Sequence, residues 1–405
     1  MRILYVTADL PWPLTSGYLR HYHFIRALSA RHGVSLLSLR SPEHGPEDLE
    51  ALAPLTEAIV TVPSARGRRS LPVKVRDRIQ VLAAGGDAAA TRLGEAGAEL
   101  AANSPFDVLL LSGKRTMPVL KALPEIPLVA DLCDATSSRV RRQMRYAPPT
   151  DLPRLGLEYL EVRGVERKLM ARARHALFAS ARDRADLVRA DATGHDRRAP
   201  ASIVPNGVDL AVWQRTQPTV GRDEIVLTGA MDYPPNVDAA IHLVEDIMPR
   251  VWAAWPTAHV SIVGRDPTQG VRDLADRPRV TVTGFVDDVR PYLERASVFA
   301  APIRFGAGIQ NKVLEALAMQ VPVVATPLAA EGLRTEEGAS PPVDIARDAA
   351  ASADRIVARL QAAATGAEAD PGPRQYVADH FDWGRNAERL ERILLDAAES
   401  GPRES

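Results

Sequence analysis

A glycine loop, a short helix and a buried strand follow one another in residues 306–326, which read GAGIQNKVLEALAMQVPVVAT. The apolar run 297–302 before them predicts a strand, so the N–H groups of the loop lie at a strand end and a helix N-terminus, where anions bind. Lys312 on the first helical turn favours a diphosphate, and Glu315 one turn later is placed to accept hydrogen bonds from ribose hydroxyls. On spacing alone, an ordinary helix–strand unit in which both charges are simply solvated is an equally good interpretation.

Length and composition limit the possible architectures in which this loop can be placed. A chain of 405 residues is too long for one ordinary core and predicts two domains of about 200 residues each. Its 46% hydrophobic and 25% charged residues are typical of a globular protein. No apolar run approaches the roughly 20 residues of a membrane span, and Asp9 interrupts the first apolar stretch, so we expect a cytoplasmic protein. The single cysteine, Cys133, excludes thiolate zinc clusters and is expected in the core.

Charge is unevenly distributed along the chain, although the net charge is only −1. Residues 1–200 hold 30 Lys and Arg against 22 Asp and Glu, and the remainder holds 20 against 29. Basic runs at 66–78 and 139–145 attract phosphate groups, an anionic membrane surface or nucleic acid, but a solvated arginine-rich surface is their commoner meaning. We expect no nucleic-acid partner, because no aromatic-interleaved basic strand or recognition helix accompanies these runs. Peripheral contact of the basic half with a membrane stays open.

Strand and helix patterns alternate along both halves of the chain. Apolar strand patterns occupy residues 2–7, 34–39, 107–111, 127–133, 175–180 and 201–204, and then 224–228, 259–263, 279–283, 297–301 and 321–325. The repeated β-α-β order predicts an α/β protein with a doubly wound, mostly parallel sheet in each half. Three strands of the second half end at Gly229, Gly264 and Gly284, which exposes backbone where open α/β sheets bind ligands. Residues 362–373 are expected to be a linker and 386–395 a final amphipathic helix.

Four segments, taken in order, carry a resemblance to a known family. They are the first strand with Ser16, Gly17 and Arg20 after it, VPNGVD at 204–209, GFVDDV at 284–289, and the stretch 306–326. Over most of its length the chain resembles proteins of the GT-B fold. More closely, it resembles the nucleotide-sugar-dependent glycosyltransferases of family four, the glycosyl transferases group 1.

The resemblance implies two Rossmann-like α/β domains that face a central cleft. Residues 1–205 would bind the acceptor, completed by about 376–405 where the C-terminal helix crosses back, and residues 206–375 would bind the donor. The implied activity moves a sugar from a nucleoside-diphosphate sugar to an acceptor hydroxyl, with retention of anomeric configuration. The acceptor would be a sugar, a lipid-linked molecule or a small molecule. No cofactor is implied beyond the donor substrate, and no metal is expected, because the sequence has no Asp-x-Asp triplet.

The same resemblance assigns the site residues. The nucleobase would lie against Gly284, Phe285 and Val286, and the ribose would bind Glu315. The donor-binding set is completed by Gly17, Gly229, Met231, Gly308, Ile309, Gln310, Asn311 and Lys312. The family's usual phosphate-binding pair is missing, so Lys312 and Arg304, the nearest cationic substitutes in the sequence, are expected to neutralise the leaving diphosphate. Asp134, at a position comparable to that of a histidine often found in the family, completes the catalytic set.

The sequence also departs from the family pattern. Ala307 stands where a glutamate that contacts the donor sugar is expected, and residues 229–236 lack the usual Gly-Arg pair and lysine. Two alternatives therefore stay open. One is a GT-B sugar-nucleotide epimerase, which the missing glutamate disfavours, and the other is a catalytically silent nucleotide-sugar-binding protein.

Overall fold

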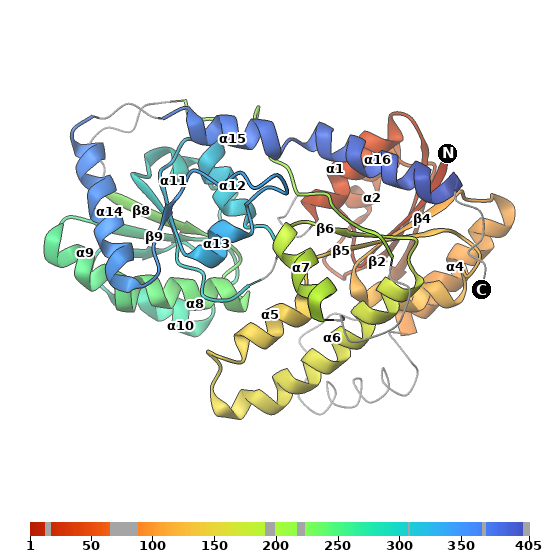
Figure 1. Cartoon of the computed structure of the whole chain (residues 1–405), viewed down its shortest axis with the longest axis horizontal. Helices are drawn as coiled ribbons and strands as arrows, with labels where there is room; N and C mark the ends of the chain where they lie inside the picture. Colours follow the sequence, from red (N-terminus) through yellow and green to blue (C-terminus); the bar gives the residue numbers. More distant parts are fainter. Residues whose placement is uncertain are drawn as a thin grey trace.

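Two parallel sheets, each flanked by helices, lie side by side along the long axis of the molecule (Figure 1). The computed structural model describes residues 1–12, 18–64, 88–190, 199–216, 223–306, 308–366 and 370–399. Within these residues the first sheet has the strand order β3-β2-β1-β4-β5-β6-β7 and the second has the order β10-β9-β8-β11-β12-β13. Both orders reverse direction next to their first strand, which is the topological switch point of a Rossmann-like sheet.

The first sheet is parallel throughout its described strands. These strands are β1 (Arg2–Thr7), β2 (Gly33–Arg40), β3 (Ala58–Pro63), β4 (Val108–Ser112), β5 (Leu128–Cys133), β6 (His175–Phe178) and β7 (Ala201–Ile203). Tyr5 of β1 stands opposite Leu36 on one side and Leu110 on the other. Central strands such as β4 are buried on both faces, which explains why they are continuous apolar runs.

Helices cover both faces of this sheet. They are α1 (Leu19–Ser29), α2 (Pro46–Leu52), α4 (Ala88–Asn103), the 3-10 segment η2 (Lys114–Lys121), α5 (Thr136–Gln143), α6 (Leu152–Arg172) and α7 (Ala181–Ala190). Helices α5 and α6 pack against each other and form a hairpin that extends from the domain (Figure 1). Among the described residues, no helix has both the length and the apolar character needed to cross a membrane.

The second domain repeats the same architecture. Its strands are β8 (Glu224–Thr228), β9 (His259–Val263), β10 (Val280–Val282), β11 (Val298–Ala301), β12 (Val323–Ala325) and β13 (Asp344–Ile345). Its helices are α8 (Pro234–His242), which continues through a π turn into α9 (Met248–Ala254), α10 (Gln269–Arg272), α11 (Arg290–Arg295), α12 (Asn311–Ala318), α13 (Pro327–Glu331) and α14 (Ala349–Ala364). The predicted order of strand, glycine loop, helix and strand is confirmed as β11, the loop, α12 and β12.

The structure also corrects the sequence-based assignment of elements. Every predicted strand is present, but β3 and β13 were not predicted, since β3 is a half-buried edge strand and β13 has only two residues. The predicted linker 362–373 is wrong at both ends, because helix α14 continues to Ala364 and helix α15 (Gly372–His380) begins before the linker was expected to end. Pro373 suggested a break in the chain, but proline is well tolerated in the first turn of a helix.

The last helix, α16 (Trp383–Glu399), crosses back onto the first domain, as predicted (Figure 1). It packs against α1 and against β4 and β5, and its buried side chains include Leu390 and Leu394. At its start, the ring of Trp383 stacks on His23 with centroids 4.5 Å apart and meets the edge of Phe24 at 5.7 Å. The C-terminal segment therefore closes the core of the first domain.

A buried arginine joins the two domains at their junction. Arg20 donates to both carboxylate oxygens of Asp131 (2.8 and 3.1 Å) and to the carbonyl of Val204 (2.7 Å). It also donates to Oδ1 of Asn206 (3.1 Å), and Nδ2 of Asn206 donates to Oδ1 of Asn311 at the start of α12 (2.9 Å). The end of β5, the interdomain link and helix α12 thus belong to one hydrogen-bonded chain.

Replacing Arg20 by methionine should lower the free energy of unfolding by about 3–5 kcal/mol, because Asp131 then stays buried without its partner. Urea unfolding followed by circular dichroism measures this loss. Glu57→Gln is the matched control, since the Arg2–Glu57 pair is exposed and such pairs contribute about 0–1 kcal/mol. Equal stability of the Arg20→Met protein and the wild type would show that the junction does not depend on this ion pair.

Candidate functional site

The loop between β11 and α12 has the geometry of an anion site. Gly308 has φ of +73°, a left-handed conformation that favours glycine. The loop leads directly into the N-terminus of α12, whose first N–H groups have no partner within the helix itself. Gly332 lies against this loop, because a Cβ at that position would be 2.9 Å from the carbonyl oxygen of Gly308. Ala307, the position of the missing glutamate, lies outside the described residues.

Lys312 and Glu315 lie together on α12 and are both half-buried. The Lys312 ammonium donates to Oδ1 of Asn236, and Nδ2 of Asn236 donates to the carbonyl of Ala230 (2.9 Å). Burial lowers the pKa of Lys312 to about 8 and raises the pKa of Glu315 to about 7. Burial therefore disfavours the charged form of each side chain. A bound phosphate would stabilise the Lys312 ammonium, and a bound hydroxyl would stabilise the Glu315 carboxylate. Asn236 belongs to the segment that lacks the usual basic residues, and the sequence did not reveal its contact with Lys312.

Glycines end the strands on the same side of the second sheet, as predicted. Gly229 and Gly264 have φ of +149° and +153°, and a Cβ on Gly264 would lie only 1.7 Å from the carbonyl oxygen of Gly229. This close approach requires glycine. Gly284 follows β10 with φ of +70°, and Phe285 after it is 72% exposed while Val286 is half-buried. The predicted nucleobase loop is therefore accessible.

Of the two remaining predicted donor residues, only Met231 belongs to the described part of the chain. Met231 is fully buried in the core of the second domain, and its N–H donates to the carbonyl of Arg265 (2.8 Å). Its side chain is thus used for packing. Gly17 lies outside the described residues.

Arg304 already has an anionic partner. Its guanidinium donates to both oxygens of Asp238 on α8, at 2.8 and 2.5 Å, and lies over the ring of Tyr146 at 5.1 Å. A bidentate pair of this kind neutralises the arginine charge. To neutralise a leaving diphosphate, Arg304 would have to exchange Asp238 for it.

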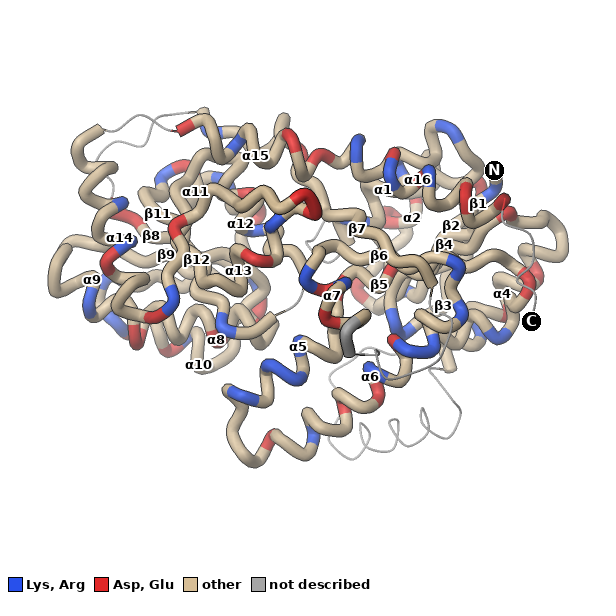
Figure 2. Tube along the Cα trace, viewed as in Figure 1, with Lys and Arg blue, Asp and Glu red and all other residues tan. Residues whose placement is uncertain are grey.

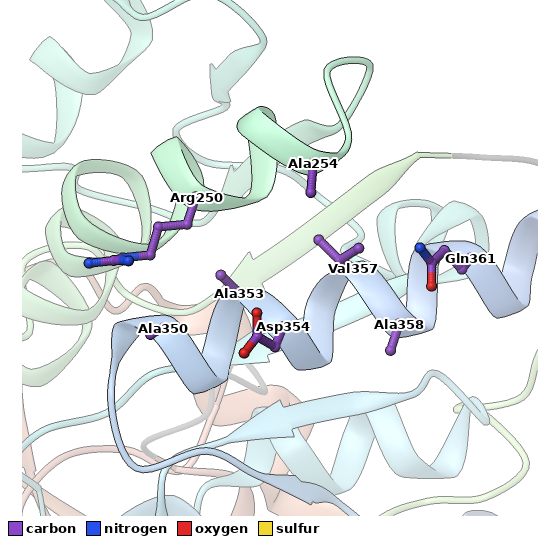
Figure 3. Close-up of a pocket in the computed structure, with 8 residues that line it drawn as sticks. All are labelled: Arg250, Ala254, Ala350, Ala353, Asp354, Val357, Ala358 and Gln361. Carbon is purple, nitrogen blue, oxygen red and sulfur yellow. The ribbon is translucent and has the colours of Figure 1, made fainter.

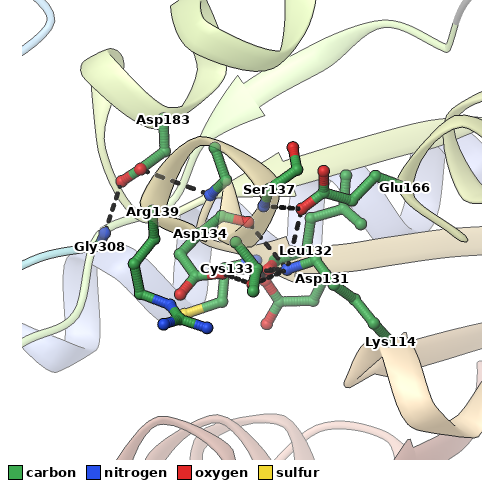
Figure 4. A network of polar contacts seen from close by, with 12 residues as sticks. Lys114, Asp131, Leu132, Cys133, Asp134, Ser137, Arg139, Glu166, Asp183 and Gly308 are labelled. Carbon is green, nitrogen blue, oxygen red and sulfur yellow. Dashed lines mark hydrogen bonds and ion pairs between the residues drawn. The ribbon is translucent and has the colours of Figure 1, made fainter. Parts of the chain in front are cut away.

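Asp134 lies just after β5 in a polar network (Figure 4). Its Oδ1 accepts hydrogen bonds from the ammonium of Lys114 (3.0 Å) and the hydroxyl of Thr136 (2.5 Å). Burial acts to raise the pKa of Asp134, but the attraction of Lys114 and these hydrogen bonds outweigh it, so the pKa lies below its ordinary value. Next to it, burial raises the pKa of Cys133 to about 12, which makes this thiol a poor nucleophile. Asp134 is an ionised carboxylate held by Lys114, a partner that the sequence did not reveal.

Residues at the start of α7 contact the glycine loop from the first domain (Figure 4). The N–H of Gly308 donates to Asp183 (2.9 Å), and Arg182 donates to the carbonyl of Leu328 (2.9 Å). Ser180 and Asp183 form a reciprocal capping contact, which is a readable helix-start signal. No sequence pattern connects that signal with a glycine 125 positions later.

A surface pocket of about 210 Å³ lies between α9 and α14, away from the first domain (Figures 1 and 3). It is lined by Arg250, Ala254, Ala350, Ala353, Asp354, Val357, Ala358 and Gln361. None of these is a predicted site residue, and alanines make up half of the lining. The candidate donor site therefore rests on the loop before α12.

Among the described residues, one group of possible metal ligands comes together: Asp9, Glu43 and His44. The carboxylate of Asp9 already accepts hydrogen bonds from the N–H of Ser41 (3.0 Å) and the hydroxyl of Tyr18 (3.1 Å). These contacts give Asp9 a structural role after β1. That the activity needs no metal stays a prediction.

The two sheets, the link between them and the returning helix define a GT-B fold. Among solved structures, the chain is similar to sucrose-phosphate synthase from Thermosynechococcus elongatus, with a TM-score of 0.70 and 17% identity over 98% of each chain. It is also similar to Anabaena HepE in complex with UDP and glucose, with a TM-score of 0.65 and 14% identity over 98% of this chain and 100% of that one. The predicted fold is confirmed.

The second domain identifies the family more closely. Residues 222–362 match the family described as glycosyl transferases group 1. The phosphatidyl-myo-inositol mannosyltransferase of Mycobacterium leprae (strain TN) is 28% identical over 214 residues, which are 49% of this chain and 54% of that protein. The chain thus spans about half the length of this curated relative. The second domain is a glycosyl transferases group 1 domain, and the predicted resemblance to the GT-B glycosyltransferases of family four is confirmed.

Anion binding at the loop should depend on the protonation of Lys312. Because the pKa of Lys312 is about 8, its affinity for pyrophosphate should fall as the pH rises through that value and the ammonium loses its proton. Calorimetric titrations between about pH 7 and pH 9.5 measure this fall. In Lys312→Arg the charge persists over the whole range, so the fall should disappear. A wild-type affinity that stays constant across it would contradict the role assigned to Lys312.

Proposed function

We propose that the protein is a glycosyltransferase that moves a sugar from a nucleoside-diphosphate sugar to an acceptor hydroxyl. One observation carries this proposal. A left-handed glycine, a helix N-terminus, Lys312 and Glu315 come together within a glycosyl transferases group 1 domain. The shifted pKa values of the two side chains indicate buried charges that a diphosphate and ribose hydroxyls would stabilise.

The chemistry that this arrangement supports is the stabilisation of a leaving group. Glycosyl transfer builds negative charge on the departing diphosphate while the sugar becomes oxocarbenium-like. In this proposal the N–H groups at the start of α12 and the Lys312 ammonium stabilise that charge. We propose that transfer proceeds without a metal and with retention of anomeric configuration. The absence of an Asp-x-Asp triplet supports the first point, and the likeness to family four supports the second.

The names of similar proteins support the proposed substrates. Anabaena HepE, whose fold this chain shares, has also been solved in complex with UDP-glucose, at a TM-score of 0.66 and 13% identity. This supports a nucleotide-sugar donor. The Mycobacterium leprae relative is named a phosphatidyl-myo-inositol mannosyltransferase. That name supports a lipid-linked acceptor over a small soluble one.

Lys312→Ala should reduce sugar transfer by about 100-fold or more, because a preorganised group facing the leaving charge is lost. Acceptor-dependent release of nucleoside diphosphate measures the rate, and an unchanged melting temperature shows that the fold is intact. Lys121→Ala, at an exposed position, is the control and should keep full activity. Full activity of the Lys312→Ala variant would contradict the proposed mechanism.

A melting screen against nucleoside diphosphates and their sugars identifies the donor base. A ligand at about 100 times its dissociation constant adds about 2.7 kcal/mol of stability. If no nucleotide raises the melting temperature, the donor site is wrongly assigned. Binding without acceptor-dependent turnover would favour a silent binding protein, and conversion of the donor sugar without an acceptor would favour an epimerase.

The α5–α6 hairpin supports a contact with a membrane surface. Basic residues gather on α5, and basic and acidic residues are mixed along α6 (Figure 2). Leu157 and Leu160 on α6 are 58% and 65% exposed and lie about 60° apart around the helix. Arg167 and Lys168 follow them at exposed positions. Exposed leucines beside basic residues fit the interface of an anionic bilayer, so we propose that the protein works on the cytoplasmic face of a membrane.

Changing Leu157 and Leu160 together to glutamate should abolish co-sedimentation with vesicles that contain about 30% phosphatidylglycerol, because it removes apolar contact and adds repulsion. Leu395→Glu on α16 is the matched control, since Leu395 is also exposed (37%) but lies on a different helix. Its vesicle binding should equal that of the wild type. Unchanged binding of the double variant would show that this face does not contact the bilayer.

A further inference from the structure

A carboxylate of the first domain lies where the glycine loop is expected to bind an anion (Figure 4). Asp183, on the first turn of α7, accepts a hydrogen bond from the N–H of Gly308 at 2.9 Å and is fully buried. The same carboxylate accepts a hydrogen bond from the hydroxyl of Ser180 and a longer one from the N–H of Ala135 (3.4 Å). It is therefore held in place by its own domain while it contacts the other.

Arg182 binds the other polar group of the same glycine. Its guanidinium donates to the carbonyl of Gly308 (3.4 Å) and to the carbonyl of Leu328 (2.9 Å), and its side chain is only 4% exposed. Consecutive side chains of α7 thus engage both the N–H and the C=O of Gly308. We call the contacts of Arg182 and Asp183 with Gly308 the α7 clasp.

A donor diphosphate and the Asp183 carboxylate compete for one position. If a phosphate oxygen accepts a hydrogen bond from Gly308, as the donor site requires, it comes within hydrogen-bonding distance of the place that Asp183 now fills. Two negative charges at such a distance in a buried site repel each other strongly. The donor can occupy the loop only after Asp183 has moved away from it.

We propose that Asp183 is an internal competitor of the donor diphosphate. In the ligand-free protein Asp183 occupies the N–H of Gly308, and the donor binds to the fraction of molecules in which this hydrogen bond is broken. Asp183 then sets the donor affinity without touching the sugar, because the observed affinity is reduced by the fraction of binding-competent molecules. This inference rests on the proposed donor site.

Asp183→Asn tests the competition, because it keeps the shape of the side chain and removes its charge. Calorimetric titration with pyrophosphate and with UDP should show about five- to tenfold tighter binding to this variant than to the wild type. Glu336→Gln is the matched control. It removes an ion pair between α7 and the second domain, Arg184–Glu336 at 2.5 Å, that is partly exposed and does not involve the loop, so its affinities should equal those of the wild type. Equal or weaker binding by Asp183→Asn would overturn the proposal.

Hydrogen exchange of the wild-type protein gives a second measurement that needs no variant. On addition of saturating pyrophosphate, amides at the start of α12 should exchange more slowly, while those around Asp183 at the start of α7 should exchange faster. Slower exchange in both segments would mean that the ligand tightens the clasp, which would also overturn the proposal.

The two proposals can fail separately. If Asp183→Asn binds pyrophosphate more tightly but the protein transfers no sugar, the proposed activity is wrong and the proposed competition is supported. If the wild type transfers sugar to an acceptor but Asp183→Asn binds pyrophosphate and UDP no more tightly than the wild type, the proposed activity is supported and the proposed competition is wrong.

Discussion

The arrangement of the two domains depends on the buried guanidinium of Arg20. Its partner Asp131 is 1% exposed and Arg20 is 4% exposed, so the pair interacts where water screens it little. The remaining donor of Arg20 binds the interdomain link at Val204 and Asn206. Because Asn206 in turn donates to Asn311, the helix that carries Lys312 is positioned from the first domain. Loss of this one charge would leave several other polar groups unsatisfied in the interior.

The contacts around Arg20 also explain the residue types of the VPNGVD segment at 204–209. Asn206 connects Arg20 with α12, and a Cβ on Gly207 would lie 2.7 Å from the ring of Trp383. The N–H of Val208 donates to the carbonyl of Phe381 (2.8 Å), just before the last helix begins. The link therefore holds the returning chain as well as the two domains, and its small and polar residues are required by close contacts rather than by the turn alone.

Local patterns made the strands, the glycine loop and Lys312 and Glu315 predictable. A parallel sheet buried on both faces needs apolar runs, and a loop before a helix at a strand end offers N–H groups whatever lies opposite. The apolar pattern was weaker for β3, which is only half-buried, and the proline in the first turn of α15 was misleading. They also said nothing about what each polar side chain would meet. Arg304 proved to be paired with Asp238, and the side chain of Met231 proved to be buried in the core.

By itself, then, the sequence determined the order of strands and helices, the position of the glycine loop between a strand and a helix, and the likeness to family four, because each depends on residues close together in the chain. The tertiary structure alone decided the partners of the charged groups: Asp183 on Gly308, Lys114 on Asp134, and Asn236 on Lys312. These contacts join residues far apart in sequence across packed elements. The pKa of an ionisable group depends on its burial and on its nearest neighbours. The charge state of the site residues therefore depends on contacts that only the folded chain, with both domains in place, brings together.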